Sequence, residues 1–389
     1  ESVAIAFMHS YRNPTNEKEV AKFLSESGYS YISLSSDLSK LIKYVSRSET
    51  TVVNAYLDKM IDTYLSGMME DFSEASFFVM NSAGGLAKAS EFRPKESLLS
   101  GPAGGVVGAV SIGLASGFED LITFDMGGTS TDVSRYGKKY DYKFEHEVGG
   151  AKIVSPALAI ETVAAGGGSI CYFDGFKLCV GPESAGAYPG PACYGAGGPL
   201  TITDVNLLSG RLDPEQFGIP VFPDDAAGKL DEMIGEIKLR SGELRKKKSI
   251  LDGFLRIANE IMAGAIKRVS VLKGYDPSEY AMIAFGGAGG MHAASIAELL
   301  NISTIIFPED SGLLSAYGMS VAPVERITEM MLMIPLENSA EELSVKFNDL
   351  SSEASEILVR DGIPAEEISI RSKMVFLRFK GQDSSIDVE

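Results

Sequence analysis

The feature that most restricts the fold of this chain is a glycine-rich loop between two short apolar segments. One apolar run ends at Asp125, and a second begins after Asp132. The loop between them contains two glycines and three hydroxyl residues, Gly127, Gly128, Thr129, Ser130 and Thr131. Glycine lets a backbone turn tightly and bring its N–H groups against an anion, and hydroxyls add donors for phosphate oxygens. The pattern predicts a strand–loop–strand phosphate site, where Asp125 and Asp132 serve as catalytic residues that hold Mg²⁺ or orient an attacking hydroxyl.

A β-hairpin that uses Gly-Gly only at its turn is the alternative interpretation of this segment. Such a hairpin requires neither the two flanking aspartates nor the three hydroxyls. Phosphate binding is therefore the preferred hypothesis.

A second glycine cluster follows the apolar run at 282–285. Gly286, Gly287 and Gly289 stand just before an expected helix at 292–300. A plain turn usually needs one left-handed position. Several glycines together indicate a planar or anionic ligand against bare backbone, with the helix N-terminus adding its positive end. The alternative is a purely structural connection.

Other segments predict helices and strands in alternation. Amphipathic helices are expected at 50–69, 225–239 and 250–272, and helices of small residues at 101–116 and 311–321. Small side chains let a neighbouring backbone come close, as a hinge or a helix between lobes requires. The pieces at 140–147 and 171–180 have the pattern of β-hairpins, the latter with Asp174-Gly175 at its turn. Asn16 is the expected N-cap of the first helix. After Pro323 the expected order is a strand (330–334), a polar helix (340–359) and a strand (373–379).

Composition excludes several classes of protein. The chain has 389 residues, which suits two or three domains. Its net charge of −18 would repel a phosphate backbone, so nucleic acid is not an expected partner. Apolar runs stay below the roughly 18 residues that cross a bilayer, and no secretory signal is visible, so no membrane partner is expected. Three cysteines without CxxC spacing indicate neither a disulfide framework nor a zinc site, and a cytoplasmic location fits best.

The stretch Asp-Met-Gly-Gly-Thr-Ser-Thr-Asp at 125–132 resembles the second phosphate loop of actin, heat-shock-70 chaperones and sugar kinases. In the same order, 101–116 resembles the first connecting helix of that superfamily, Gly286–Gly290 its adenosine loop, and 311–321 its second connecting helix. The resemblance implies an α/β fold with ribonuclease-H-type lobes, in which mixed sheets are flanked by helices.

Within that superfamily the chain resembles the hydantoinase A / 5-oxoprolinase family. The motifs include Leu-Ser-Gly-Pro-Ala-Gly-Gly at 99–105, Pro-Gly-Pro-Ala-Cys-Tyr-Gly at 189–195 and Ala-Phe-Gly-Gly-Ala-Gly at 284–289. Further matching segments lie at 9–14, 51–56, 165–169, 181–186, 203–206 and 210–212, in the family's order along nearly the whole chain. The resemblance places Gly167 and Gly168 near the active cleft as cofactor-binding residues. A plain tight turn is the alternative, and a dinucleotide fingerprint is excluded because a strand, not a helix, follows.

The chain also departs from the family pattern. The family's first phosphate loop would stand upstream of residue 1, and the C-terminal domain would continue past Gly381, so a fragment or split subunit is expected. Glu161 stands where the family has histidine, and Ala196 where it has arginine, which leaves the substrate open. The expected domains are the remainder of the first lobe (1–118), the second lobe (119–325) and the start of a C-terminal α/β domain (326–389).

The resemblance implies an oligomeric, ATP- and Mg²⁺-dependent hydrolase that phosphorylates a lactam or hydantoin oxygen, with a hydantoinase-B-type partner subunit. Alternatives are a subunit of an acetone-carboxylase-type enzyme, or a nucleotide-binding protein without turnover.

Four weaker candidates have structural alternatives. Asp204 and Asn206 could be N-caps of a helix at 205–208, and Arg211 could form a structural ion pair instead of binding a phosphate or carboxylate. Cys193 fits a core residue better than a nucleophile. His9 could be a metal ligand, although no partner ligand is readable.

Overall fold

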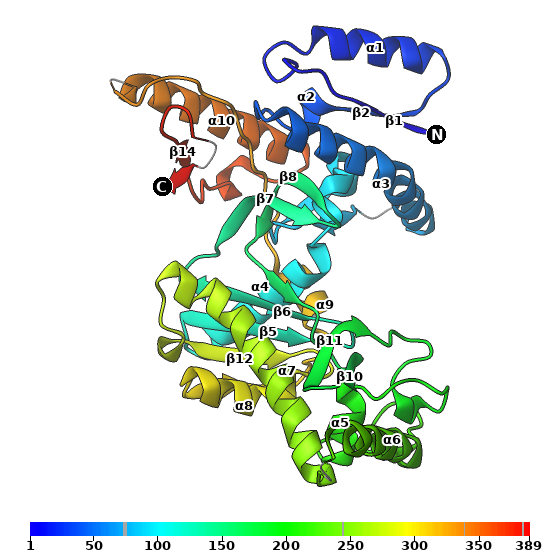
Figure 1. The fold of residues 1–389 in the computed structure, drawn as a ribbon. Coiled ribbons are helices and arrows are strands. Elements are labelled where there is room, and N and C mark those ends of the chain that lie inside the picture. Colours follow the sequence, from blue (N-terminus) through cyan, green and yellow to red (C-terminus); the bar gives the residue numbers. More distant parts are fainter. Residues whose placement is uncertain (73–75, 243–244, 338, 383–384) are drawn as a thin grey trace. The chain divides into compact units, whose positions relative to one another are not determined.

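The computed structural model describes residues 1–72, 76–242, 245–337, 339–382 and 385–389, shown in Figure 1. Contacts between residues divide the chain into two compact units. Unit 1 comprises residues 1–98, 144–156 and 323–389, and unit 2 comprises residues 99–143 and 157–322. The three-domain division expected from the sequence stays a prediction.

Unit 2 contains a five-stranded mixed sheet. Its spatial order is β13 (Thr304–Ile306), β12 (Ala281–Phe285), β5 (Asp120–Met126), β6 (Thr131–Gly137) and β9 (Glu161–Val163). β5, β12 and β13 are parallel, whereas β6 is antiparallel to both β5 and β9. From β9 the strands run third, second, first, fourth and fifth in chain order, with the second reversed. This is the arrangement of a ribonuclease-H-type lobe, so the α/β fold class expected from the sequence is confirmed.

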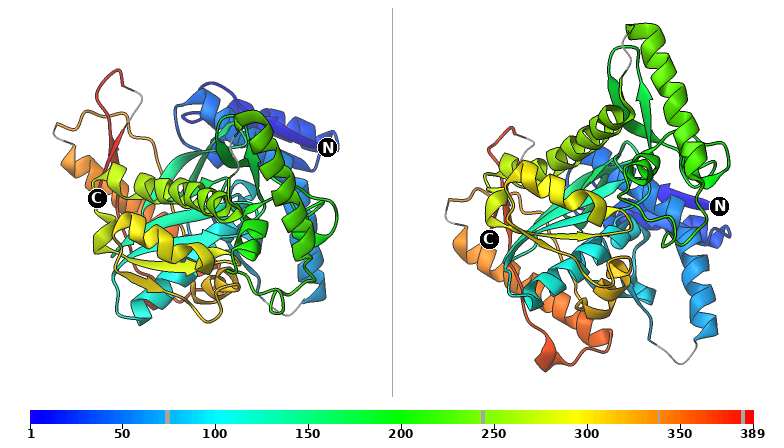
Figure 2. Two further views of the ribbon diagram at one scale, coloured as in Figure 1. Left: turned by 60° about the horizontal axis from the view of Figure 1, so that its bottom comes forward. Right: turned by 90° about the horizontal axis from the view of Figure 1, so that it is seen from below.

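Helices cover both faces of this sheet, and its strands are therefore apolar on both sides (Figures 1 and 2). On β5, Ile122, Phe124 and Met126 join the larger core with α7 (Lys247–Val269) and α8 (Gly289–Leu300). Leu121 points to the opposite face and packs with α4 (Ser100–Ala115). These four side chains are fully buried, and each such burial stabilises the fold by about 1.5–3 kcal/mol.

The sequence predicts two small-residue helices that let a neighbouring backbone come close, and in the structure the two pack against each other. α4 packs against α9 (Leu314–Val321) through glycine, and a Cβ added at Gly104 would lie 2.9 Å from the backbone oxygen of Ser315. A Cβ at Gly318 would overlap the backbone of Gly104. Any larger residue at these positions would force the two helices apart.

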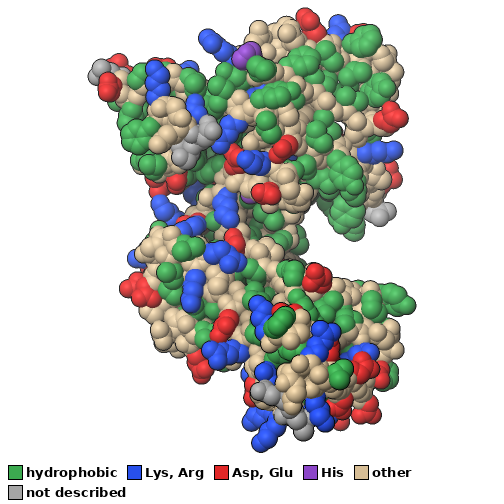
Figure 3. All heavy atoms as spheres, in the orientation of Figure 1, with side chains coloured by type: hydrophobic (Ala, Val, Ile, Leu, Met, Phe, Trp, Pro, Cys, Tyr) green, Lys and Arg blue, Asp and Glu red, His purple; other side chains and the backbone are tan. Residues whose placement is uncertain are grey.

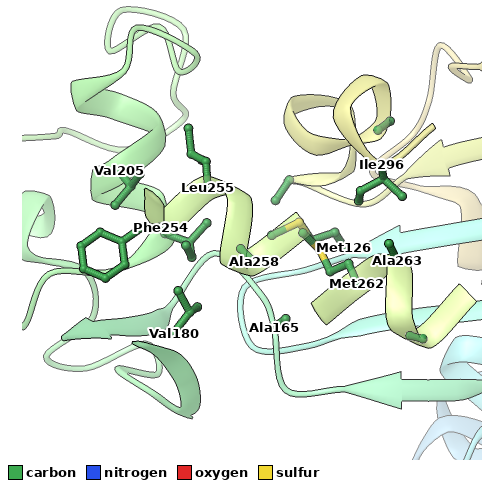
Figure 4. Packing of buried hydrophobic residues seen from close by; sticks show 14 of the residues in the cluster. Met126, Ala165, Val180, Val205, Phe254, Leu255, Ala258, Met262, Ala263 and Ile296 are labelled. Carbon is green, nitrogen blue, oxygen red and sulfur yellow. The ribbon is translucent and has the colours of Figure 1, made fainter. Parts of the chain in front are cut away.

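The rest of unit 2 is built from α5 (Ile202–Leu208), α6 (Pro223–Ser241) and an antiparallel hairpin. The hairpin pairs β10 (Ser169–Phe173) with β11 (Leu178–Ser184). Its turn is the expected one, because the Asp174 carboxylate accepts hydrogen bonds from the backbone N–H groups of Phe176 and Lys177. Figure 4 shows α7 passing from Val205 and Val180 at one end to Met126 and Ile296 at the other, so one helix ties these parts to the sheet.

Unit 1 begins with two parallel strands, β1 (Ser2–Ile5) and β2 (Tyr31–Leu34). The helices of this region are α1 (Thr15–Glu26), α2 (Ser35–Leu38) and α3 (Tyr44–Asp71). The expectation that Asn16 caps α1 is wrong. The helix begins at Thr15, and the Asn13 side chain accepts the hydrogen bond from the Thr15 N–H.

The remaining elements of unit 1 are short hairpins and one long helix. β3 (Phe78–Met80) pairs with β4 (Leu86–Lys88), β7 (Tyr142–Val148) with β8 (Ala151–Leu158), and β14 (Val375–Leu377) with β15 (Ile386–Val388). The segment 140–147 is thus one arm of a hairpin, not a whole one. The polar helix is α10 (Ala340–Arg360), whereas the strand expected at 330–334 is not formed among the described residues. Short 3₁₀ turns lie at Ala89–Glu91, Pro94–Ser97 and Ala365–Glu367 in unit 1, and at Ala192–Tyr194, Val271–Lys273 and Pro277–Glu279 in unit 2.

In the described part of the chain, no helix is both long and apolar enough to span a membrane. On the face drawn in Figure 3, acidic and basic side chains are interspersed.

Candidate functional site

Glycine-rich segments of unit 2 meet at the carboxyl ends of the parallel strands β5 and β12. Loop 127–130 follows β5, and loop 286–288 follows β12. The two are joined by a 2.9 Å hydrogen bond from the Ala288 N–H to the Met126 carbonyl. In open α/β sheets, ligands bind beyond the carboxyl ends of the strands, so this edge is the candidate site.

Asp125 and Asp132 stand directly opposite each other on β5 and β6. Burial, reinforced by the charge of Asp132, raises the pKa of Asp125 to about 6. Burial also raises the pKa of Asp132, although Thr162 opposes this by donating a 2.5 Å hydrogen bond to its Oδ1. Both carboxyls are therefore poorly solvated as anions, and a cation between them would favour their charged forms.

Loop 127–130 rests on a third glycine-rich segment, loop 165–168. The N–H groups of Gly167 and Gly168 donate to the carbonyls of Gly127 and Gly128 at 3.1 and 2.6 Å. A Cβ at Gly166 would lie 2.6 Å from the backbone carbon of Thr129, so only glycine allows this approach. Gly167 and Gly168, expected to contact a cofactor, are buried, and their hydrogen bonds support loop 127–130.

The hydroxyls expected to bind phosphate lie in different surroundings. Thr129 is exposed and Ser130 is half-buried. Thr131 is fully buried, and its Oγ1 donates a 2.5 Å hydrogen bond to the Ala165 carbonyl. Because its one proton is used there, the Thr131 hydroxyl fastens loop 165–168 to the sheet instead of facing a ligand.

Open space lies beside the glycine backbone of loop 127–130 and of loop 286–288. A Cβ at Gly128 or Gly287 would meet no atom within 4 Å, and one at Gly127 would meet only the Ser130 oxygen at 3.9 Å. Gly286 is different, since its φ is +77° and a Cβ there would overlap Oδ1 of Asp125. Gly289 is buried as the first residue of α8.

The structure gives Asp204 a structural role. It is not the N-cap of α5 but the third helical residue of a capping box, where its carboxylate accepts from the Thr201 N–H at 2.7 Å. It also accepts from the backbone N–H groups of Ala192 and Cys193. Asn206 is not an N-cap either, because its side chain hydrogen-bonds to His292.

The other weak candidates also have local partners. Arg211 donates from Nη1 to the Met291 carbonyl at 2.9 Å. Cys193 is buried, and its pKa is raised by burial and by Asp204, which suits a core residue and disfavours a thiolate nucleophile. Glu161 pairs with Arg268 at 2.6 Å. His9 is an exposed residue of unit 1, and no group of three or more potential metal ligands is found in the described residues.

Sequence reasoning missed the buried His292 and the Thr162 hydroxyl. Thr162 lies on β9, opposite Asp132 in the ladder, and only the β6–β9 pairing brings the two together. The sequence pattern places His292 only at the start of an expected helix. A histidine among apolar residues on a buried helix face was the signal that could have singled it out.

The sheet topology and the conjunction of glycine-rich loops define an α/β protein with an actin-like fold. A family model described as hydantoinase/oxoprolinase matches residues 47–328, and the chain belongs to this family.

Individual relatives agree with this assignment. The chain is 38% identical over 420 residues to 5-oxoprolinase from Dictyostelium discoideum, covering all of this chain and 33% of the relative. It is 31% identical over 405 residues to the caprolactamase subunit alpha of Pseudomonas jessenii, covering 58% of that subunit. The crystal structure of the ATP-dependent caprolactamase from Pseudomonas jessenii matches with a TM-score of 0.81 at 28% identity, over 100% of this chain and 58% of that one. The chain thus spans about a third of the 5-oxoprolinase and somewhat over half of the caprolactamase subunit.

Proposed function

We propose that this chain is part of an ATP-dependent hydrolase that opens a cyclic amide after phosphorylating its carbonyl oxygen. The observation that carries the proposal is the carboxylate pair Asp125–Asp132 at the edge where loop 127–130 and loop 286–288 meet. Phosphoryl transfer depends mainly on positioning and charge neutralisation, which glycine-rich loops and carboxylate-held cations supply. Membership of the hydantoinase/oxoprolinase family supports the same reaction class.

Each part of the site has a distinct role in this proposal. The open backbone at Gly127 and Gly128, with the Thr129 and Ser130 hydroxyls, receives the phosphates. The open backbone at Gly287 admits the nucleoside, and the N-terminus of α8 adds a positive partial charge. Loop 165–168 keeps loop 127–130 in place from beneath.

The carboxylates fit a divalent cation, because Asp125 and Asp132 face each other and are both poorly solvated as anions. Mg²⁺ prefers carboxylate oxygens and water, and when bound it would neutralise charge on the phosphoryl group. Asp125 lies so close to Gly286 that a side chain at Gly286 would overlap its carboxylate. Asp132 is oriented by the hydrogen bond from Thr162.

The chemistry requires activation because a lactam carbonyl is a poor electrophile. Transfer of the γ-phosphoryl group to the amide oxygen leaves ADP and an imidate-like phosphate ester. Water then adds to that carbon and the C–N bond breaks, which leaves an acyl phosphate and the free amine. A second water attacks the acyl carbon, and inorganic phosphate departs with the former carbonyl oxygen. The products are the ring-opened amino acid, ADP and phosphate.

The substrate class includes 5-oxoproline, hydantoins and larger lactams, since the relatives are named as 5-oxoprolinase and caprolactamase. A hydantoinase-B-type partner is part of the proposal, because the caprolactamase relative is named as an alpha subunit. An oligomeric assembly is proposed on the same grounds, whereas a cytoplasmic location is proposed from the cysteine pattern.

The test is ADP release by the full-length protein, with any subunit that co-purifies, in the presence of 5-oxoproline, hydantoin or caprolactam. We expect one of these to stimulate ADP release by at least about tenfold over the substrate-free rate. Stimulation by acetone plus bicarbonate alone would identify a carboxylase instead. Tight nucleotide binding without stimulation by any substrate would identify a non-catalytic nucleotide-binding protein.

A further inference from the structure

His292 joins three helices of unit 2 through its two ring nitrogens. Its Nδ1 lies 2.7 Å from Oδ1 of Asn259 on α7, and its Nε2 lies 3.0 Å from Nδ2 of Asn206 on α5. His292 itself is the fourth residue of α8. Exposed fractions of 0% for His292 and Asn206, and 5% for Asn259, show that water has little access to these groups.

The two asparagine side chains set the protonation pattern of the ring, whereas the buried Oδ1 of Asn206 has no hydrogen-bond partner in the described structure. The Asn259 oxygen accepts, so Nδ1 carries the ring proton, and Nε2 is left to accept from the Asn206 amide. Burial, together with the nearby charge of Arg211, lowers the pKa of His292 to about 4. The ring therefore stays neutral at physiological pH, with one donor and one acceptor each satisfied.

The triad lies immediately behind the candidate nucleotide loop. His292 follows loop 286–288 by one helical turn, and Arg211 donates to the carbonyl of the preceding residue, Met291. The Arg211 backbone N–H in turn donates to the Asn206 carbonyl at 2.9 Å. The side chains of Asn206 on α5 and of Arg211 just beyond it thus both hold the first turn of α8.

The other end of α5 holds a different loop of the same site. Thr203 donates from its backbone N–H and from Oγ1 to the Gly167 carbonyl, at 2.7 and 2.9 Å. Thr203 and Asn206 are three residues apart and so share one face of the helix. α5 therefore links loop 165–168, which supports loop 127–130, to α8 and loop 286–288.

We propose that Asn206, His292 and Asn259 form a positioning triad that fixes the first turn of α8 and loop 286–288 relative to loop 127–130. An apolar side chain would fill the same volume, but packing alone allows a helix to rotate or slide. Two directional hydrogen bonds to two other helices set its rotation as well. The effect of the triad on nucleotide binding rests on the proposed function. Its effect on the geometry of loop 286–288 does not depend on that function.

Hydrogen exchange of the full chain tests the geometry without any ligand. The amides of Gly286, Ala288 and Met291 donate to Ser311, Met126 and Ala288, respectively. In His292→Leu we expect these amides to exchange at least about tenfold faster, because the buried asparagines lose their partner and α8 shifts. The matched control is Ile296→Val, a fully buried change on the same helix that touches no triad hydrogen bond. Equal exchange at these amides in both variants would overturn the proposal.

A second variant covers the case in which His292→Leu does not fold. Asn206→Ala removes the α5 partner while leaving the ring and the Asn259 hydrogen bond in place. The amides of Gly286, Ala288 and Met291 should exchange faster in Asn206→Ala than in wild type. In His292→Gln, whose side chain can both donate and accept a hydrogen bond, they should exchange at about the wild-type rate. Unchanged exchange in Asn206→Ala would contradict the proposal.

Nucleotide titration separates this inference from the proposed function. If wild-type protein binds ATP with Mg²⁺, His292→Leu should bind at least about tenfold more weakly, and Ile296→Val within about twofold of wild type. Faster exchange in a protein whose wild type binds no nucleotide would refute the proposed function and leave the triad standing. Wild-type affinity in His292→Leu would refute the triad as a device for nucleotide binding.

Discussion

Asp125 and Asp132 are register partners across β5 and β6, with loop 127–130 closing the strands beside them. Their carboxyls therefore point to the same face of the sheet, and burial together with this proximity raises the pKa of Asp125 to about 6. Thr162 orients Asp132 from the neighbouring strand β9. Such a pair is costly in the absence of a cation.

Asp125→Asn keeps the shape of the side chain and removes its charge. In the full-length enzyme we expect turnover to fall by roughly two orders of magnitude, about 3 kcal/mol of transition-state stabilisation. The fold should survive, because the change relieves an unfavourable burial. Steady-state ADP release measures the effect. Glu119→Gln, which breaks an exposed pair with Lys138, is the control and should leave the rate unchanged. A wild-type rate in Asp125→Asn would remove this residue from the mechanism.

The raised pKa of Asp125 predicts how nucleotide binding depends on pH. Below about pH 6 the carboxyl is protonated and cannot hold Mg²⁺. The affinity for ATP with Mg²⁺ should therefore fall as pH drops through about 6, by up to about tenfold per unit. Titration calorimetry from about pH 5 to about pH 8 brackets the pKa of Asp125 and measures this dependence. A flat profile in wild type, like the one expected for Asp125→Asn, would contradict the assignment.

The same pKa makes an opposite prediction for the stability of the ligand-free protein. A carboxyl whose folded pKa lies above its unfolded value stabilises the fold at low pH and loses that contribution as pH rises through about 6. Asp125→Asn should therefore raise the free energy of unfolding by about 1 kcal/mol above that pH, after allowance for partial solvation. Urea unfolding on both sides of the transition checks the sign. A loss of stability at high pH would show that the carboxylate is favourably held.

Gly287→Val separates nucleotide binding from turn formation. A Cβ at Gly287 meets no protein atom within 4 Å, so we expect the variant to fold normally. It would occupy the space assigned to the nucleoside, and ATP affinity should fall by at least about tenfold, or about 1.4 kcal/mol. Gly235→Val, at an equally open position on α6, is the control. Wild-type affinity in Gly287→Val would reassign loop 286–288 as structural.

Gly166→Ala tests whether loop 165–168 supports loop 127–130. The new Cβ would lie 2.6 Å from the Thr129 carbon and 2.7 Å from the Ser130 nitrogen, both backbone atoms that cannot rotate away. We expect the free energy of unfolding to fall by about 2 kcal/mol. Gly128→Ala, on the facing loop, points into open space and should change stability by less than about 0.5 kcal/mol. Equal stability of the two variants would mean that the loops do not touch in solution.

The sequence was sufficient to predict the central strand–loop–strand unit and the two small-residue helices, but not that these helices contact each other. Both are local patterns, in which apolar runs, glycines and hydroxyls stand in one short stretch. It was not sufficient to assign Thr131, whose hydroxyl proved to be bonded to Ala165. Ala165 lies in loop 165–168, 34 residues along the chain from Thr131. The orientation of a hydroxyl depends on such tertiary neighbours, which a local pattern does not reveal.

Capping and the polar triad show the same limit. Asp204 is of a residue type that favours the N-cap position. Thr201 occupies that position instead, because the helix begins earlier than its apolar pattern suggests. Segment 330–334 has a strand-like composition and yet forms no strand, since strand formation depends on an available partner. His292, Asn206 and Asn259 lie in three separate helices, so their convergence could be seen only in the folded chain.

The central claim is that the carbonyl oxygen of a cyclic amide is phosphorylated before the ring opens. The most direct test uses a substrate lactam labelled with ¹⁸O at that carbonyl, together with unlabelled ATP and the full-length enzyme. Mass spectrometry of the released inorganic phosphate should find one ¹⁸O atom per turnover, because the phosphate leaves with the former carbonyl oxygen. Phosphate without the label, and label retained in the ring-opened product, would contradict the account.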